Sequence, residues 1–168
     1  MKIDEFVKSL RNSGEVNVDG SLFRAPGVAL GRVLAQHLAG LFPSDTEIAY
    51  GVQTAELAGK PQGWEGTTDW YLIIGRHILY VSLSITPDPS GGSRATGQHE
   101  IRRLDSISKI DVKHVNVEIG GMAAKEGITI IVTFTDGNAW KLEANTPRPQ
   151  SAAVRRFVAE ITRLAPAM

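Results

Sequence analysis

The sequence predicts an α+β fold in which two N-terminal helices precede an antiparallel, partly open barrel of about seven strands, and a final helix caps the barrel. Three observations lead to this prediction. Apolar residues recur at helical spacing before Pro43, alternate along the chain from Ile48, and return to helical spacing after Pro149. Turns containing glycine separate the alternating stretches, as is typical of antiparallel strands joined by short connections.

Length and composition limit the classes of protein that this chain can belong to. Its 168 residues fit one domain with a small appendage, and 42% hydrophobic against 21% charged residues indicates a packed core. Lys+Arg and Asp+Glu are both 18, so no overall field attracts nucleic acid or an acidic membrane. The absence of cysteine excludes disulfides, thiolate nucleophiles and cysteine-based metal sites.

The N-terminus carries acids where a signal peptide would have its apolar core, and no apolar run is long enough to span a bilayer. We therefore expect a cytoplasmic protein without a membrane span.

Two amphipathic helices are expected first. The first ends near Gly14, and its apolar stripe consists of Ile3, Phe6, Val7 and Leu10. Residues 15–27 read as a loop with one extended piece at Val16–Val18. The second helix covers residues 28–42, with Leu30, Val33, Leu34, Leu38 and Leu41 on one face.

Glycines weaken this second helix. Gly31 and Gly40 are each expected to cost about 1 kcal/mol relative to alanine. The helix therefore needs a partner surface, which the sheet would supply.

A central hairpin organises the predicted sheet. Residues 67–75 and 77–85 are rich in aromatic and β-branched side chains, and Gly75 marks the turn between them. The second arm is apolar on both faces, so we expect both faces to be at least partly buried. A strand near Ile48–Val52 precedes the hairpin, and residues 58–66 and 86–97 read as long loops.

Further strands are expected at residues 98–104, 107–117, 128–135 and 139–144. Between the last two strands, a three-residue loop Asp136–Asn138 would place Trp140 opposite Phe134 and Leu142 opposite Val132. This register keeps apolar side chains together and calls for positive φ at Gly137 or Asn138. A final helix from about residue 149 to residue 165 has the apolar stripe Val154, Phe157, Val158, Ile161 and Leu164.

Three segments in this order resemble bacterial pleckstrin-homology-like (PH-like) domains: 44–48, 70–80 and 101–107. The resemblance covers about residues 45–166 and divides the chain into an N-terminal helical extension, 1–44, and a PH-like domain, 45–168. It implies a seven-stranded, partly open barrel whose end is plugged by the C-terminal helix. It also implies a binding role, toward lipid headgroups or proteins, and no chemistry.

Phosphoinositide-binding members of the family carry a basic cluster on their first two strands. Here Lys60 stands alone until Arg76, so a phosphoinositide ligand is not expected. The candidate binding surface is instead a basic patch on neighbouring predicted strands, comprising Arg76, His77, Arg102, Arg103, Lys109 and Lys113, with His114 beside them. The alternative is that these charges only protect strand edges from aggregation.

No pattern points to catalysis, to a metal or to a cofactor. The histidines His37, His77, His99 and His114 have no metal-ligand spacing, and we expect His37 to be a partly buried structural residue. Glu65 and Asp69 are candidates for an acid–base pair, but solvated turn residues are the better interpretation. No serine elbow or phosphate-cradling loop is present.

The sequence therefore favours a non-enzymatic binding or scaffolding module that engages a protein partner. One alternative is a helix-grip (START-like) domain that holds a small apolar ligand or lipid in an internal cavity. Another is a structural domain that associates with itself through Trp64 and the N-terminal helices.

Overall fold

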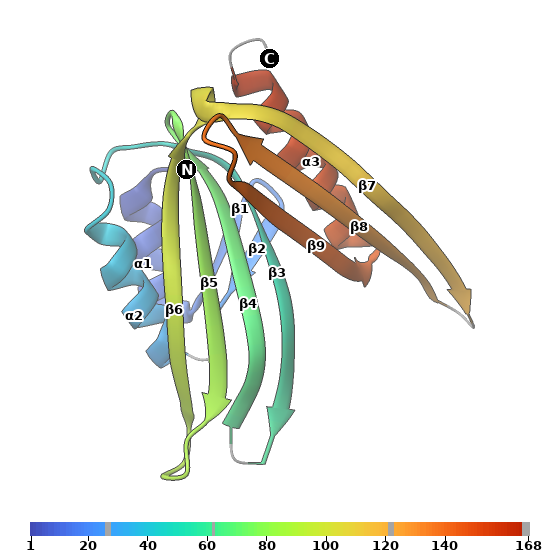
Figure 1. The fold of residues 1–168 in the computed structure, drawn as a ribbon. Coiled ribbons are helices and arrows are strands. Elements are labelled where there is room, and N and C mark those ends of the chain that lie inside the picture. The colour runs from blue at the N-terminus through green and yellow to red at the C-terminus, as the bar shows by residue number, and fades with distance from the viewer. Residues whose placement is uncertain (26–27, 62, 121–122, 166–168) are drawn as a thin grey trace. The chain divides into compact units, whose positions relative to one another are not determined.

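The computed structural model describes residues 1–25, 28–61, 63–120 and 123–165, which form two compact units, Met1–Ile101 and Arg102–Met168 (Figure 1). The expected α+β class is confirmed, as are the antiparallel strands and the final helix. The helices and strands are α1 (Ile3–Ser13), β1 (Glu15–Val18), β2 (Ser21–Arg24), α2 (Val28–Ala39), β3 (Ile48–Lys60), β4 (Gly63–Ile74), β5 (His77–Pro87), β6 (Ser93–Arg103), β7 (Ile107–Gly120), β8 (Ala123–Phe134), β9 (Ala139–Pro147) and α3 (Arg148–Leu164).

The strands form sheets of two, four and three, in the orders β1-β2, β3-β4-β5-β6 and β7-β8-β9. Neither unit closes its sheet into a barrel within the described residues, so the seven-stranded PH-like barrel stays a prediction. None of the helices in those residues is long and apolar enough to cross a membrane.

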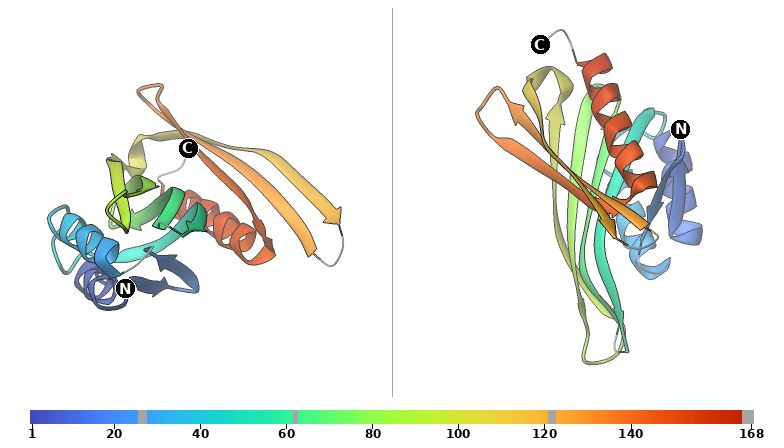
Figure 2. Two further views of the ribbon diagram at one scale, coloured as in Figure 1. Left: turned by 90° about the horizontal axis from the view of Figure 1, so that it is seen from below. Right: turned by 90° about the vertical axis from the view of Figure 1, so that its right-hand side faces the viewer.

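In the first unit, α1, α2 and the β1-β2 hairpin lie on one face of the four-stranded sheet (Figure 2). The predicted central hairpin is β4-β5, in which Leu72 pairs with Leu79 and Gly75 has φ 56° in the turn. Three aromatic rings join the layers: Phe6 lies 5.7 Å from Phe23 and 6.4 Å from Trp70. These rings belong to α1, β2 and β4, so they tie the helical layer to the sheet.

Buried residues between Ile3 and Leu38 thus share one apolar core with the sheet, and the compact units divide after Ile101. The division at residue 44, which follows from the resemblance, stays a prediction. Tyr50, Val52, Tyr71, Ile73 and Ile78 lie on the other face of the sheet.

Two predicted loops are mostly strand. The ladder continues past the core, so that β3 reaches Lys60 and β5 reaches Pro87. At its far end the Trp64 N–H donates to Ser93 Oγ over 2.8 Å, and the long strands run past the ends of α1 and α2 (Figure 1). Because the register of the hairpins is fixed in the core, the strands stay paired beyond it, even where the side chains are small and polar.

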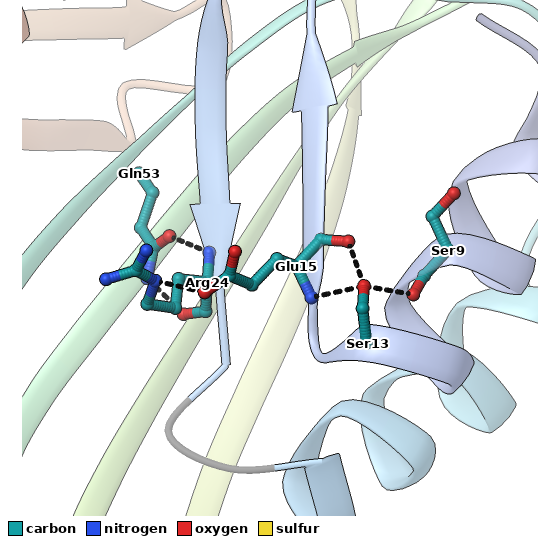
Figure 3. Close-up of polar contacts among 5 residues, drawn as sticks. All are labelled: Ser9, Ser13, Glu15, Arg24 and Gln53. Atoms are coloured by element: carbon teal, nitrogen blue, oxygen red, sulfur yellow. Dashed lines mark hydrogen bonds and ion pairs between the residues drawn. The ribbon is translucent and has the colours of Figure 1, made fainter.

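The extended piece predicted at Val16–Val18 is confirmed as β1, but the predicted loop around it also contains β2, which completes a hairpin. Its two-residue turn has positive φ at Asp19, 49°, and at Gly20, 88°. The hairpin is tethered to α1, because Ser13 Oγ donates to the Ser9 carbonyl and accepts from the Glu15 N–H (Figure 3). Glu15 in turn pairs with Arg24 across the hairpin over 2.6 Å.

The buried face of α2 matches the predicted stripe at every position but Val33. Gly31, Leu34 and Leu38 are buried, whereas Val33 is 60% exposed. A Cβ at Gly31 would lie 2.7 Å from the Leu10 carbonyl oxygen, so α1 approaches α2 at this glycine. Leu30 and Leu41 also pack against the core, so the predicted stripe is confirmed except at Val33.

In the second unit, α3 contacts β8 and β9, and Val154, Phe157 and Ile161 are buried against them. The predicted docking of the final helix is confirmed within this unit (Figure 2).

The β8-β9 loop has the predicted length and positive φ at Gly137, 86°, but its predicted register is wrong. Trp140 pairs with Val132, since the Phe134 N–H bonds to the Asn138 carbonyl and the loop starts one residue earlier. Apolar side chains still face one another, and the Phe134 and Trp140 rings contact at 4.8 Å.

Candidate functional site

The predicted basic patch is divided between the two units. Arg76 and His77 lie at the β4-β5 turn, where the His77 ring is 6.1 Å from that of Phe42. Arg102, Arg103, Lys109 and Lys113 belong to the second unit, at the end of β6 and in β7.

Acidic side chains accompany most of the patch in the second unit. Arg103 Nε donates to Asp105 over 3.0 Å, and Lys109 lies 2.9 Å from Asp111. Arg102 pairs with Asp136 and also lies over the Phe134 ring, 4.9 Å from its centroid. These pairs reduce the unbalanced positive charge that recognition of an acidic partner requires. The role of the patch stays a prediction.

The Asp136 carboxylate shows how strong this compensation is. A hydrogen bond from Arg102, followed by bonds from the backbone and side chain of Asn138, lowers the pKa of Asp136 to about 2. Hydrogen bonds to the charged form stabilise it over the protonated acid. Arg102 is therefore engaged inside its own unit, holding the β8-β9 turn.

A hollow of about 420 Å³ opens beside α1. The apolar side chains of Ile3 and Val7, which are 2% and 7% exposed, lie on its floor. It forms because the start of α1 is bonded to the segment before β3: the Ile3 N–H donates to the Thr46 carbonyl over 3.0 Å, and the Asp4 N–H does so to Ser44. The remaining lining residues are Asp4, Lys8, Arg11, Asn12, Ala39 and Ser44.

The rim of this hollow carries unbalanced charge. Lys8 and Arg11 lie on α1 at positions four and seven residues after Asp4, so they share one side of the helix. Among the described residues neither cation forms an ion pair, in contrast to Arg102, Arg103 and Lys109. An apolar floor beneath two cations is a surface that can bind an apolar side chain and an anion together.

The candidate acid–base pair does not assemble. Glu65 and Asp69 stand four residues apart on β4, which separates them by about 13 Å. Asp69 instead accepts a hydrogen bond from Tyr80 over 3.2 Å. Burial raises the pKa of Tyr80, and the charge of Asp69 adds to the rise.

The prediction that His37 is partly buried is wrong, and the side chain of His114 lies outside the described residues. His37 is exposed, and its Nε2 lies 2.8 Å from Nδ1 of His99, which belongs to β6 of the same unit. The described residues contain no group of three or more histidine or acidic side chains that could hold a metal ion together.

Comparisons with protein-family models, curated proteins and solved structures find no match for this chain.

Sequence reasoning missed both the hollow and the histidine pair. Ile3 and Val7 read only as core positions of an amphipathic helix, and nothing local indicates that the segment before β3 leaves them at the bottom of an opening. His37 and His99 are 62 residues apart, so only the packing of α2 on β6 brings them together. The polar side of α1, with Lys8 and Arg11 in line, was the one available signal.

Proposed function

We propose that this chain is a non-enzymatic binding module of PH-like form that engages a protein partner through the hollow beside α1. The order of elements supports the PH-like part of the proposal, because four antiparallel strands, β3–β6, are followed by three, β7–β9, and then by the helix α3. That is the order of strands and final helix on which the sequence resemblance rests.

One observation carries the binding role: Lys8 and Arg11 stand without ion-pair partners among the described residues, above the apolar floor of Ile3 and Val7. The partner segment that fits is a short peptide with an apolar side chain beside Asp or Glu. Exposed ion pairs contribute about 0.2–1 kcal/mol each, so the expected complex is weak and salt-sensitive.

The charged, open rim also favours a peptide over the apolar ligand of a helix-grip cavity. Such a ligand is largely enclosed by apolar side chains, whereas this hollow has Asp4, Lys8 and Arg11 around its opening. A cytoplasmic location and the lack of a nucleic-acid partner belong to the same proposal. The zero formal net charge supports the second of these two statements.

Selection of random phage-displayed peptides on the purified full chain tests the proposal. We expect enrichment of peptides that place acidic residues next to a large apolar residue. Binding should disappear in the double variant Lys8→Glu/Arg11→Glu and persist in Arg32→Glu, which reverses an exposed charge on α2 outside the hollow. Amide shifts in NMR spectra should change around Ile3 and Val7 when such a peptide is added.

A second double variant separates the hollow from the basic patch. Arg103→Glu/Lys113→Glu changes the patch and leaves α1 untouched. If this variant abolishes peptide binding while Lys8→Glu/Arg11→Glu retains it, the hollow is not the binding site and the patch is. Light scattering across concentration covers the remaining alternative, since self-association would raise the apparent mass without any peptide.

A further inference from the structure

His37 and His99 meet across two elements of the first unit. His37 lies in the last turn of α2 and His99 lies in the middle part of β6, with Nε2 of the first 2.8 Å from Nδ1 of the second. Their ring planes are inclined by 70° and the ring centroids are 4.4 Å apart. A hydrogen bond that ran straight along the axis of each ring would hold the two centroids farther apart than this. The ring axes are therefore inclined to the line that joins the two nitrogens.

We propose that this pair is a binding site for a divalent transition-metal ion that prefers right-angled coordination, copper(II) or nickel(II). Imidazole nitrogens bind such metals at about 2.0 Å, and two ligands at a right angle are then about 2.8 Å apart. Tetrahedral coordination of zinc would need about 3.3 Å between the same two nitrogens. The observed 2.8 Å therefore matches the tetragonal ions without movement of either element.

The proton balance of binding is simple. In the metal-free pair, one of the two facing nitrogens carries the hydrogen and the other accepts it. With a metal bound, both facing nitrogens are ligands, so the hydrogen of His37 must lie on Nδ1 and that of His99 on Nε2. One imidazole changes tautomer through solvent, both rings stay neutral, and no net proton is released from the neutral pair.

The surroundings of the two histidines favour the metal-bound pair over the metal-free pair that is joined only by a hydrogen bond. An exposed hydrogen bond between two imidazoles exchanges with water and contributes little to stability. A metal ion at this place lies at the C-terminal end of α2, where the helix dipole attracts positive charge. The described residues offer no further histidine or acidic ligand, so water completes the coordination. Two ligands fixed on a helix and a strand give moderate affinity.

Titration of the full chain, purified without a histidine tag, with Cu²⁺, Ni²⁺ and Zn²⁺ in turn tests this proposal by calorimetry. We expect one Cu²⁺ site, with Ni²⁺ next and Zn²⁺ weakest. The variants His37→Gln and His99→Asn retain an amide nitrogen close to the position of the lost ring nitrogen, so they keep a hydrogen bond while removing a metal ligand. Each should weaken Cu²⁺ binding by about tenfold or more, since even loss of an outer-shell partner costs about 10–100-fold.

The matched control is His77→Gln, which removes a histidine of the same unit that packs on Phe42 away from this pair. Its Cu²⁺ affinity should equal that of the unchanged chain, and electron paramagnetic resonance of the copper complex should show two nitrogen ligands in both. Equal Cu²⁺ affinity in the unchanged chain, His37→Gln and His99→Asn would overturn the proposal. So would tighter binding of Zn²⁺ than of Cu²⁺, because the right-angled geometry would then be wrong.

Discussion

The side-chain amide of Gln53 forms with the backbone of Arg24 the two hydrogen bonds that a neighbouring strand would otherwise form. Gln53 Oε1 accepts from the Arg24 N–H over 2.6 Å, and Gln53 Nε2 donates to the Arg24 carbonyl over 2.8 Å (Figure 3). The second hydrogen of Nε2 goes to Thr68 Oγ1, which also accepts from Trp70 Nε1 over 3.1 Å. One buried amide thus fastens the end of β2 to β3 and β4, and all of its polar groups are satisfied.

Replacing this amide should destabilise the first unit. Gln53→Ala leaves the Arg24 N–H and carbonyl without these partners, and an unsatisfied buried group costs about 1–3 kcal/mol. The Thr68 hydroxyl keeps its bonds with Trp70 and Thr54. We expect the free energy of unfolding, measured with urea, to fall by about 2–3 kcal/mol in total. Gln36→Ala, at an exposed position on α2, should change it by less than about 0.5 kcal/mol. Equal effects of the two changes would show that the Gln53 amide is not structural.

Gly31 gives a second prediction, which reverses the usual rule for glycine in helices. Gly→Ala ordinarily stabilises a helix by about 1 kcal/mol. A Cβ at Gly31 would, however, lie 2.7 Å from the Leu10 carbonyl and 2.9 Å from Gly14 Cα, and both are backbone atoms that cannot move aside. Gly31→Ala should therefore lower the free energy of unfolding by about 1–3 kcal/mol.

Gly40→Ala is the matched control for this change. The nearest atom to its Cβ would be the His37 carbonyl oxygen at 3.7 Å, an ordinary contact. In thermal melts, the melting temperature of Gly31→Ala should fall, whereas that of Gly40→Ala should rise or stay unchanged. Stabilisation by Gly31→Ala would mean that α1 and α2 are not in close contact.

The fold could be predicted where local pattern and tertiary packing agree. The hairpin of β4 and β5 alternates cleanly around Gly75, and α1 has one apolar stripe closed by Gly14 in left-handed conformation, φ 72°. Only the first strand of the β1-β2 hairpin was predicted, at Val16–Val18. The second was missed although Asp19-Gly20 is a strong hairpin signal, because a strand of four residues shows little alternation. The apolar pattern of α2 could not show that Val33 is exposed, nor that α1 comes close to α2 at Gly31.

The candidate sites were harder to predict because they depend on distant segments. Lys8 and Arg11 gain their role from the segment before β3, which closes one side of the hollow. The partners of Arg102 and Lys109 are acids whose proximity follows from the β8-β9 turn and from strand spacing. A count of basic residues along the sequence cannot tell paired cations from unpaired ones.

Asp136 predicts a specific pH dependence. Its pKa in the folded state is about 2, below the ordinary value of 3.8, because Arg102 and Asn138 bond to the ionised form. A depressed pKa stabilises the fold above the ordinary pKa, and this contribution is lost as the pH falls from about 4 to about 2. Carbon NMR of the carboxyl group should show its midpoint near pH 2. In Arg102→Gln the midpoint should rise toward the ordinary value.

The control for this titration is Arg103→Gln, which removes the partner of Asp105 and leaves the Arg102 bond in place. The midpoint of Asp136 should then stay where it is. A rise of equal size in both variants would mean that general positive charge, and not the Arg102 hydrogen bond, holds the pKa of Asp136 down.

Phe157 tests the docking of α3 on the second sheet. Its side chain is 1% exposed between Val154 and Ile161, which are fully buried on the same helix. Truncating a buried phenylalanine costs about 3–5 kcal/mol, and Phe157→Asp adds the burial of an unpaired carboxylate. The second unit should lose its packed structure, seen as a lower melting temperature by circular dichroism. Ala159→Asp places the same charge at an exposed position of α3 and should cost less than about 1 kcal/mol. Melting curves that coincide for the two variants would show that α3 does not depend on this contact.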